Sequence, residues 1–385
     1  MEFPLSEEHR LFRETMKRFV DEEMIPVEME TCENGELKPE WREKFHARAR
    51  ELGIWKMEVP EEYGGVGADL ITLVIVWEQL GRTVAVPTRG LGGMMGPQVR
   101  APLYELSDAM KARYLFPVLN GEKTACFAQT EPDAGGDPGA MRTTAVRDGD
   151  HYAIDGTKRF ITDADNADFC QLLAATDREK GSRGGISMFL VDMDTPGVKI
   201  TAHFDTMMGD RPCEIHFDNV RIPVEQRIGE EGEGFSLGQR FLANGRLKHG
   251  ARGVGTAQRC LDMMCEYARQ RVTFGRPLAD RQAVQWMIAD TYVEIQAARL
   301  MVYATAAQAA AGIDDRTDGF IQKMYADELG FRAADRCLQV HGGIGLTTDL
   351  PIERFWRQSR SFRITEGPTE IMKMVIARNV LREYG

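Results

Sequence analysis

The chain has 385 residues, of which 43% are hydrophobic and 28% are charged, a composition ordinary for a globular protein with ample material for a core. The formal net charge of −11 argues against a protein that binds nucleic acid non-specifically, and no basic run contradicts this. No apolar run approaches the ~20 residues that span a bilayer, and the acidic amphipathic amino terminus is unlike a signal peptide. We therefore expect a cytoplasmic protein that does not insert into membranes.

Helical periodicity dominates the first 122 residues. Apolar residues recur on one helical face from Ser6 to Met24, and Pro26 ends this run. Further helices are predicted from Glu40 to Leu52, from Leu70 to Leu80 and from Ser107 or Asp108 to about Val118. The glycine-rich loop before Leu70 lacks G-x-G-x-x-G, so it does not predict a dinucleotide-binding turn.

At about Glu122 the apolar period changes from 3.6 to 2, which is typical of strands. The predicted strands are Lys123–Thr130, Tyr152–Thr162, Phe169–Thr176, Gly185–Met193, Val198–Ala202 and Cys213–Ile222. Helical periodicity returns at Gly234, and the predicted helices are Phe235–Gln270, Arg281–Ala311, Asp318–His341 and Pro368–Glu383. Helices of this length predict a bundle. We expect an α+β fold with an N-terminal helical domain (1–122), a central antiparallel β domain (123–233) and a C-terminal four-helix bundle (234–385).

A sharp turn, Glu131–Asp137, follows the first predicted strand. Pro132 and the pair Gly135-Gly136 permit a tight backbone path that can bring bare N–H groups against a ligand. Phe160 and Thr162 on the next predicted strand offer an aromatic face and a hydroxyl, which suits a flat heterocycle with polar edges. Taken alone, such a turn is more often a simple surface connection.

Glu366 is the strongest candidate for chemistry. It precedes Gly367-Pro368, a helix-start pattern, so the helix dipole favours its carboxylate while burial raises its pKa. We expect a bound apolar substrate to tip this balance upward, so that the carboxylate can take a proton from carbon. The alternative is a glutamate that only caps the last helix.

A second cluster begins at Arg271 in the sequence RVTFGR and is followed by Gln282. Guanidinium and backbone donors next to a helix start can bind phosphate, although exposed arginines are usually only solvated. The seven histidines show no metal spacing, and there is no nucleophile elbow. The seven cysteines are scattered without a Cys-x-x-Cys pair and predict reduced core thiols.

These motifs, in this order over essentially the whole chain, resemble those of the FAD-dependent acyl-CoA dehydrogenases. TEPDAGGD resembles a TEPxAGSD-like turn, with Gly136 where the family usually has Ser, and FRITEGPTEIM resembles the segment of the catalytic glutamate. The resemblance implies Glu366 as the catalytic base and Gly136, Arg246 and Gly367 as substrate-binding residues. It implies FAD binding by Phe127, Gln129, Thr130, Gly135, Gly136, Phe160, Ile161, Thr162, Arg271, Thr273, Phe274, Gln282, Gln339, Gly342, Gly343, Thr369 and Glu370.

Some positions depart from the family pattern. Thr365 stands where Tyr is common, Pro368 where a flavin-contacting Thr is common, and Ala243 where an acidic partner of Arg246 is usual. Some members place the base directly before the arginine matched by Arg246, and Gly245 closes that option here. In the family, the segments matching RVTFGR and LQVHGGIG reach the flavin of the neighbouring subunit.

The function that the resemblance implies is dehydrogenation of an acyl-CoA thioester to a trans-2-enoyl-CoA, as in fatty acid β-oxidation, with hydride transfer to FAD. It also implies a homotetramer or homodimer and an electron-transferring flavoprotein as acceptor. Two alternatives stay open: an acyl-CoA oxidase or flavin monooxygenase on the same fold, and a flavin- or CoA-binding protein without catalysis. The residues give no indication of acyl chain length, branching or ring content.

Overall fold

The structure is a computed structural model that describes residues 3–33, 35–87, 94–313 and 316–384. The chain folds into two compact units. A helical unit combines residues 1–96 with residues 243–385, and a β unit contains Pro97–Leu242. The amino-terminal and carboxyl-terminal helices therefore pack in one unit, although the whole β unit separates them in the sequence. The three-part division at residues 122/123 and 233/234 stays a prediction about domain boundaries.

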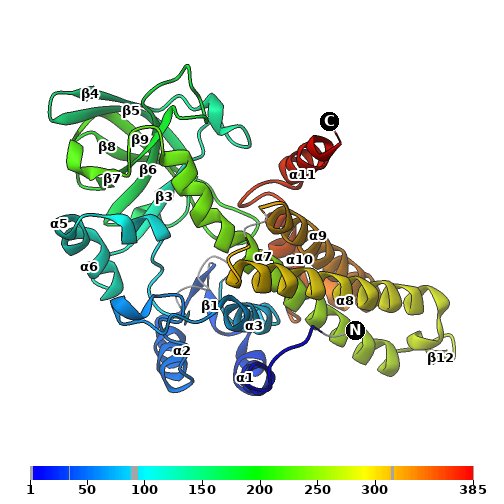
Figure 1. Cartoon of the computed structure of the whole chain (residues 1–385). Helices are drawn as coiled ribbons and strands as arrows, with labels where there is room; N and C mark the ends of the chain where they lie inside the picture. The colour runs from blue at the N-terminus through cyan, green and yellow to red at the C-terminus, as the bar shows by residue number, and fades with distance from the viewer. Residues whose placement is uncertain (1–2, 34, 88–93, 314–315, 385) are drawn as a thin grey trace. The chain divides into compact units, whose positions relative to one another are not determined.

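The amino-terminal part of the helical unit contains α1 (Glu7–Phe19), α2 (Pro39–Glu51) and α3 (Leu70–Leu80), with a short hairpin of β1 (Cys32–Glu33) and β2 (Glu36–Leu37) before α2 (Figure 1). The Ser6 hydroxyl caps α1 by accepting the His9 N–H at 3.1 Å, and the Asp69 carboxylate caps α3 in the same way. A π-helical turn at Val20–Met24 follows α1 before Pro26. These helices confirm the three that periodicity predicts up to Leu80.

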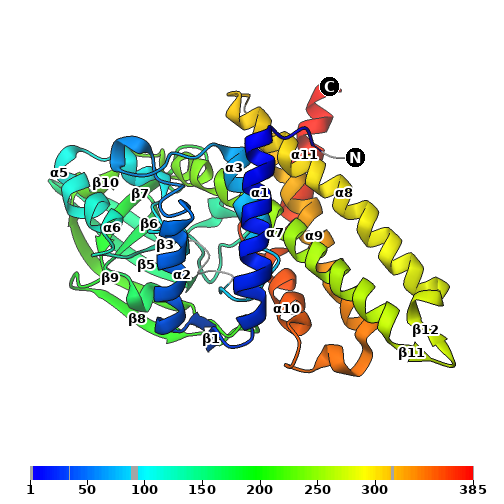
Figure 2. The same ribbon diagram turned by 90° about the horizontal axis from the view of Figure 1, so that it is seen from below.

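The carboxyl-terminal part contains α7 (Gly234–Gln270), α8 (Gln282–Ala310), α9 (Arg316–His341), α10 (Ile352–Phe362) and α11 (Thr369–Glu383). Helix α7 belongs to the helical unit from Ala243 onward. Its later turns run beside α8 and α9, and the small hairpin of β11 (Val272–Thr273) and β12 (Arg276–Pro277) joins α7 to α8 (Figure 2).

Glycines on α7 allow close contact with α9. A Cβ on Gly253 would overlap the Ala326 backbone, and a Cβ on Gly250 would overlap the Gln322 amide. Because the two backbones approach so closely, side chains of α9 can reach across α7. The buried core around this contact draws on both ends of the chain, from Trp77 of α3 to Phe355 of α10.

The β unit is built on an eight-stranded sheet with the order β10-β7-β6-β4-β5-β9-β8, and β3 lies beside β6. The strands are β3 (Ala125–Ala128), β4 (Thr144–Asp148), β5 (His151–Ile161), β6 (Phe169–Ala175), β7 (Ile186–Asp192), β8 (Val198–His203), β9 (Cys213–Pro223) and β10 (Arg227–Ile228). Most pairs are antiparallel, as predicted, but β3 and β4 each pair with β6 in parallel. The register of β5 against β9 shifts between Lys158 and Ile161, so Phe160 lies in an irregular stretch.

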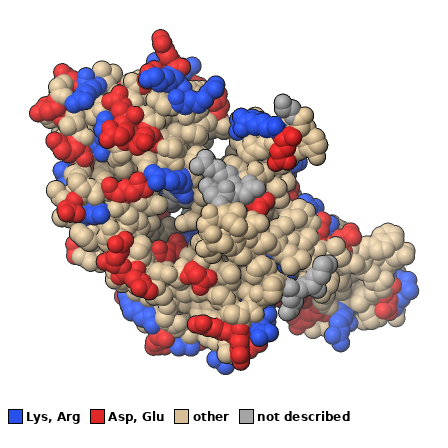
Figure 3. All heavy atoms as spheres, in the orientation of Figure 1, with Lys and Arg blue, Asp and Glu red and all other residues tan. Residues whose placement is uncertain are grey.

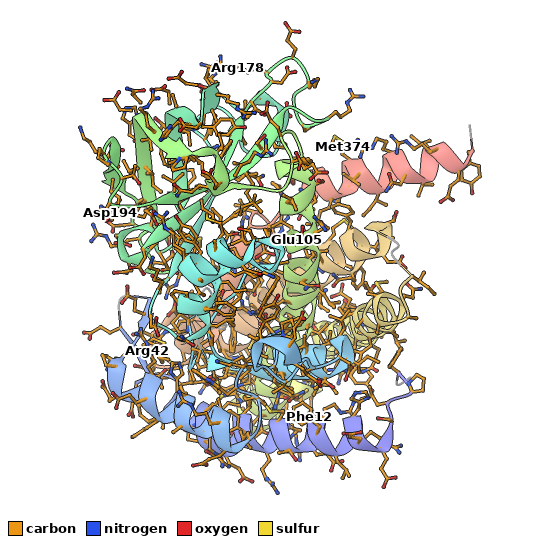
Figure 4. The ribbon with its side chains drawn as sticks, turned by 60° about the vertical axis from the view of Figure 1, so that its left-hand side comes forward. Phe12, Arg42, Glu105, Arg178, Asp194 and Met374 are labelled. Atoms are coloured by element: carbon orange, nitrogen blue, oxygen red, sulfur yellow. The ribbon has the colours of Figure 1, made fainter. Side chains whose placement is uncertain are left out.

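Short helical segments precede this sheet within the β unit. Helices α5 (Asp108–Met110) and α6 (Phe116–Leu119) flank a π-helical turn, Lys111–Leu115, where the sequence predicts one continuous helix. Buried Tyr114 donates its hydroxyl to Asp192 at 3.0 Å. Glu105, labelled in Figure 4, pairs with Arg240 at 3.1 Å.

Apart from the two-residue strands, one helix and one strand escape the periodicity analysis. Helix α10 buries Ile352, Phe355, Ser359 and Phe362, which is a helical spacing, but three arginines and three other polar residues between them mask it. Strand β4 is short and half exposed, and its best signal is the Asp148-Gly149 turn that leads into β5.

All seven cysteines are free thiols, and five of them are buried. On the face drawn in Figure 3, Lys and Arg side chains alternate with Asp and Glu side chains. Within the described ranges, no helix is both long and apolar enough to cross a membrane. The cytoplasmic location stays a prediction.

Candidate active site

The segment between α10 and α11, residues 363–368, carries Glu366 in a strained turn. Glu366 has φ +54°, in the left-handed region that costs a residue with a Cβ ~1–2 kcal/mol, and Gly367 follows with φ +109°. Lys323, only 1% exposed on α9, donates hydrogen bonds to the carbonyls of Phe362, Thr365 and Gly367 at 2.9, 2.8 and 3.0 Å. Helix α9 thus fixes the turn on both sides of Glu366. Helix α11, marked by Met374 in Figure 4, begins directly afterwards.

The Glu366 carboxylate lies against α7 at Gly245. A Cβ on Gly245 would overlap Oε2 and Cδ of Glu366 and crowd Oε1, so any other residue here would force the carboxylate to move. Gly245, His249 and Arg252 are spaced four and three residues apart, which places them on one face of α7. His249 Nε2 is 3.6 Å from Glu366 Oε1.

His249 lies between two carboxylates. Its Nδ1 is 3.7 Å from Oδ2 of Asp327, and that oxygen is 3.0 Å from Nζ of Lys323. Both histidine distances exceed hydrogen-bond length, so these contacts are electrostatic. The imidazole is 7% exposed and packs edge-on against the Phe362 ring, with centroids 4.9 Å apart. Helices α7 and α9 and the 363–368 segment together form a buried array of alternating charge.

The positive charges around Glu366 decide the direction of its pKa. Burial raises the pKa, but His249, Lys323 and Lys248 outweigh burial and lower it to about 2. For His249, burial lowers the pKa, and the carboxylates of Glu366 and Asp327 reverse this and raise it. The sequence predicts burial and a helix start, but the cations come from α7 and α9. Without a ligand, the Glu366 side chain is 32% exposed and ionised over a wide pH range.

Two further cations of α7 flank this array. Arg252 stacks over Phe362, 4.9 Å from the ring centroid, and burial lowers its pKa to about 10 against the opposing effect of Glu366 and Asp327. Lys248 pairs with Glu58 at 3.2 Å. The carboxylate of Glu366 therefore faces an excess of positive charge.

Arg246 is buried rather than a solvated helix arginine. Its guanidinium lies 4.4 Å from the Phe320 ring centroid, and its backbone carbonyl accepts a hydrogen bond from Gln322 Nε2 at 3.0 Å. This packing holds the α7 backbone next to Gly245.

The two predicted cofactor residues that follow Glu366, Thr369 and Glu370, differ in their surroundings. The Thr369 hydroxyl donates to Glu328 Oε1 at 2.9 Å and its N–H donates to the Arg363 carbonyl at 3.0 Å, so both groups are engaged within the helical unit. Glu370 is exposed in the first turn of α11.

In the β unit, the turn after β3 is anchored by a buried ion pair. Lys158 Nζ is 2.7 Å from Glu131 Oε1 and also donates to the Gln129 carbonyl at 3.1 Å. Glu131 accepts the N–H of Thr143 at 3.0 Å. Burial lowers the pKa of Lys158 to about 8 although Glu131 raises it, and Lys158 in turn holds the pKa of Glu131 below its ordinary value against the effect of burial. The turn is therefore a rigid feature rather than a loose connection.

Phe160 forms the opposite side of this turn. It has φ +61°, its ring is 53% exposed, and it packs edge-on against Phe204 at 4.9 Å. The Arg159 N–H donates to the Thr130 carbonyl at 2.8 Å, which ties the two segments together. Ile161 is buried behind them and Thr162 is partly exposed. Phe127, Gln129, Thr130, Gly135, Gly136, Phe160, Ile161 and Thr162 thus come from adjoining segments of one unit.

These residues fit a flat ring with polar edges, such as a flavin. Gln129 Oε1 is buried and accepts no hydrogen bond from any described residue. A Cβ on Gly135 would meet open space, so packing does not explain the glycine there, whereas a bare backbone beside a ligand would. The exposed Phe160 ring supplies an apolar face.

The remaining predicted cofactor residues lie in the helical unit, far along α7 from the part that adjoins Glu366. Arg271, Thr273 and Phe274 belong to the β11–β12 hairpin, which is ~36 Å along α7 from Arg246 at 1.5 Å per residue. Tyr267 stacks on His341 with centroids 4.3 Å apart, so the hairpin lies beside the exposed residues Gln339, Gly342 and Gly343. Gln282 begins α8. The structure therefore brings the hairpin residues close to those at the end of α9 and separates both from Glu366.

One cluster of metal-ligand type occurs in the β unit. Asp165, His203 and Cys213 bring potential ligand atoms within 4.8 Å of one another. Burial and the Asp165 charge raise the pKa of Cys213 to about 11, so its thiol is neutral near neutral pH.

Sequence reasoning missed His249, Asp327, Lys323 and Arg252. A signal was present: Gly245, His249 and Arg252 share a helical face, and Lys323 and Asp327 are four residues apart on a helix whose apolar face is buried. What the sequence could not show is that these two faces meet at Glu366.

Comparison with known proteins agrees with the fold. Three family profiles match: "Acyl-CoA dehydrogenase, N-terminal domain" over residues 6–122, the middle domain over 126–220 and the C-terminal domain over 232–381. The fold of helical, β and helical parts, with these three matches, thus defines a flavoprotein oxidoreductase of this type. The chain belongs to the acyl-CoA dehydrogenase family.

Similar proteins include dehydrogenases and reductases. The "3-(aryl)acrylate reductase" of Clostridium sporogenes is 35% identical, covering 98% of this chain and 99% of its own. The "Caffeyl-CoA reductase-Etf complex subunit CarC" of Acetobacterium woodii is 34% identical with the same coverages. The structure of butyryl-CoA dehydrogenase from Megasphaera elsdenii has a TM-score of 0.84 and 30% identity, covering 99% of this chain and 100% of its own.

Proposed function

We propose that this protein is an FAD-dependent acyl-CoA dehydrogenase in which Glu366 removes the α-proton of an acyl-CoA thioester to give a trans-2-enoyl-CoA. The observation that carries the proposal is the position of Glu366: a strained turn held by Lys323, with the carboxylate against Gly245. A capping glutamate needs neither the strain nor the buried cations. The last helix is capped at Pro368, and Glu366 makes no hydrogen bond to its N–H groups within the described chain.

The residues of this chain position the substrate and move the proton. Glu366 accepts the α-proton on a carboxylate oxygen, so the C–H bond breaks, an O–H bond forms and the electron pair stays on the substrate. The Glu366 N–H donates no hydrogen bond among the described residues, so it is available to the thioester carbonyl, where enolate charge develops. Arg246, one residue beyond Gly245, is the proposed contact of the coenzyme A portion.

FAD is the proposed cofactor, and when bound it accepts the hydride from the β-carbon. The residues proposed to hold its ring are those around the Glu131–Asp137 turn and Phe160. The exposed apolar face of Phe160, the unpaired Gln129 Oε1 and the bare backbone at Gly135 support this.

We also propose a homotetramer or homodimer. Phe274 is 98% exposed at the tip of the hairpin, and Trp286 and Val293 of α8 are 60% and 65% exposed. Large hydrophobic side chains this exposed favour burial by another subunit. Since Arg271 and Phe274 lie ~36 Å along α7 from Arg246, they support contact with a second subunit's cofactor. An electron-transferring flavoprotein is the proposed acceptor, because CarC is named as part of an Etf complex.

The test is an anaerobic titration of the purified yellow protein with a panel of acyl-CoA thioesters, following flavin absorbance. We expect bleaching with at least one thioester. Glu366→Gln should keep FAD and ligand binding but slow bleaching about a thousandfold. Glu383→Gln, an exposed change on α11, is the matched control. Normal bleaching by the Glu366→Gln variant would remove Glu366 from the reaction.

A second candidate is the reverse reaction, reduction of an enoyl-CoA, because two similar proteins are named as reductases. The same base would then return a proton to the α-carbon. Mixing the reduced enzyme with enoyl-CoA and measuring flavin reoxidation separates the two directions. Rapid reoxidation by air alone would instead favour an oxidase or monooxygenase, and binding without bleaching would favour a non-catalytic protein.

A further inference from the structure

His249 has no assigned role in proton removal, yet its imidazole adjoins the carboxylate of Glu366 and can carry the opposite charge. It is buried, with Glu366 Oε1 3.6 Å from Nε2 and Asp327 Oδ2 3.7 Å from Nδ1. Asp327 is 1% exposed and is held by Lys323 at 3.0 Å. Lys323 also fixes the turn of Glu366, so one lysine orients both neighbours of the imidazole.

We propose that His249, oriented by Asp327, is a positioning residue that controls the protonation of Glu366. As an imidazolium, it keeps Glu366 a carboxylate and a weak base between turnovers. As a neutral imidazole, it leaves Glu366 a stronger base for the α-proton. This inference rests on the proposed role of Glu366.

Every charged group packed around the imidazole enters this balance. From the 363–368 segment comes Glu366, and from α9 come Asp327 and Lys323. From α7 come Lys248, which pairs with Glu58, and Arg252, which stacks on the same Phe362 ring as His249. The two carboxylates adjoin the ring directly and favour its protonation, whereas the three cations oppose it. The direct neighbours prevail, and the pKa of His249 is raised above 6.5.

The consequence is a rise in base strength at a pH set by His249. Below that pH, the imidazolium stabilises the Glu366 carboxylate and reduces its affinity for a proton. Above it, this stabilisation is lost, and burial raises the proton affinity of Glu366. Proton removal should therefore speed up as the pH rises through the titration of His249.

Exchange of α-hydrogen for deuterium measures this step without hydride transfer. Glu366 takes the α-proton, the bound proton exchanges with D2O, and a deuteron returns to the carbon, so no oxidant is needed. Phenylacetyl-CoA is the probe, because its ring acidifies the α-hydrogens and its β-carbon carries no hydrogen. The FAD-loaded protein is assayed by mass spectrometry from about pH 5 to about pH 9.

We expect the wild-type rate to rise about tenfold across one step in this range. His249→Gln, which keeps an N–H donor but does not titrate, should lose the step and move the acid limb of the profile up by about one pH unit or more. Asp327→Asn removes a carboxylate from Nδ1 and should move the step to lower pH. His216→Gln, an exposed histidine of β9, is the matched control and should leave the profile unchanged.

A second readout does not depend on turnover. Coupling between the two groups is reciprocal, so Glu366→Gln should lower the pKa of His249. NMR of the 13C-labelled imidazoles, with His249→Gln to assign the signal, measures this directly.

The outcomes separate this inference from the proposed function. If Glu366→Gln abolishes exchange while the profiles of His249→Gln and Asp327→Asn superimpose on the wild type, His249 has only a structural role and the inference is overturned. If Glu366→Gln still exchanges, or the wild type exchanges with neither phenylacetyl-CoA nor acetyl-CoA, the proposed function itself is overturned. Should His249→Gln fail to fold, the position of the step in Asp327→Asn decides.

Discussion

Lys323 holds Glu366 through the backbone: its buried ammonium donates to the carbonyls of Thr365 and Gly367, the two neighbours of the glutamate. A residue on α9 thereby fixes a side chain that projects toward α7. The orientation of the carboxylate is set by a helix that does not carry it. The same lysine pairs with Asp327, which adjoins His249.

Replacing this lysine should affect both stability and proton removal. Lys323→Met keeps the volume but leaves Asp327 as a buried carboxylate without its lysine, and three carbonyls lose a donor. We expect a loss of about 3 kcal/mol in the free energy of unfolding. Misplacement of Glu366 should slow flavin reduction about a hundredfold. Urea unfolding and stopped-flow absorbance measure the two effects. Lys373→Met, exposed on α11, is the control, and equal behaviour of both variants would refute the anchoring role.

Gly245 should be intolerant of even one methyl group. Gly245→Ala improves helix propensity by about 1 kcal/mol, but its Cβ would overlap the Glu366 carboxylate and force it to move. We expect flavin reduction to slow by a factor of about ten or more. Gly319→Ala on α9, where a Cβ meets open space, should gain stability and keep the rate. A Gly245→Ala enzyme with an unchanged rate would show that Glu366 does not need this space.

Acid should destabilise the folded chain through Glu366. Its pKa is about 2 in the folded state against 4.5 for an unperturbed glutamate. Above 4.5 the carboxylate is ionised in both states, and its stabilising contribution is complete. As the pH falls from about 4.5 toward 2, the unfolded chain binds the proton first, so stability is lost.

Glu366→Gln removes this contribution and should flatten the acid limb of stability. Urea midpoints measured from about pH 6 down to about pH 2.5 give the comparison, with Glu383→Gln as the control. Glu131, whose pKa is also lowered, adds a similar loss in both proteins and does not affect the difference. Parallel curves for the wild type and Glu366→Gln would contradict the lowered pKa.

Phe274 should report on assembly. Its ring is 98% exposed and its φ is +49°, so it presents an aromatic side chain at a strained hairpin tip. If another subunit covers it, Phe274→Asp should shift the protein toward monomers and reduce its FAD content. Analytical ultracentrifugation and the flavin-to-protein absorbance ratio measure both. Val146→Asp, 62% exposed on β4, should change neither. Intact oligomers in the Phe274→Asp variant would exclude the hairpin from the interface.

The sequence predicts much of this architecture because local patterns specify it. The apolar stripe of α1 follows from burial of one face, and the nearly continuous apolar runs of α3, β6 and β7 follow from burial on all sides. Helix α10 is harder, since its arginines dilute the stripe of Ile352, Phe355 and Phe362. The Glu366 position also follows from a local pattern, namely a helix start preceded by Glu-Gly-Pro.

The electrostatic environment of Glu366 does not follow from a local pattern, because it depends on tertiary contacts. His249 and Lys323 are more than forty residues from Glu366 in the sequence, and only the packing of α7 against α9 brings them to it. Single-sequence periodicity places residues on faces but does not say which faces meet. The direction of the Glu366 pKa in this structure therefore depends on contacts that the sequence pattern does not specify.

The stack of Tyr267 on His341 has a consequence for how the protein would respond to dilution. It holds the end of α7, which leads into the hairpin, beside the end of α9, which leads into the Gly342-Gly343 segment, so the two form adjoining parts of one platform. If that platform touches the neighbour's flavin, assembly and prosthetic-group retention become a single equilibrium. The protein concentration would then determine which fraction of the molecules retains the coloured cofactor.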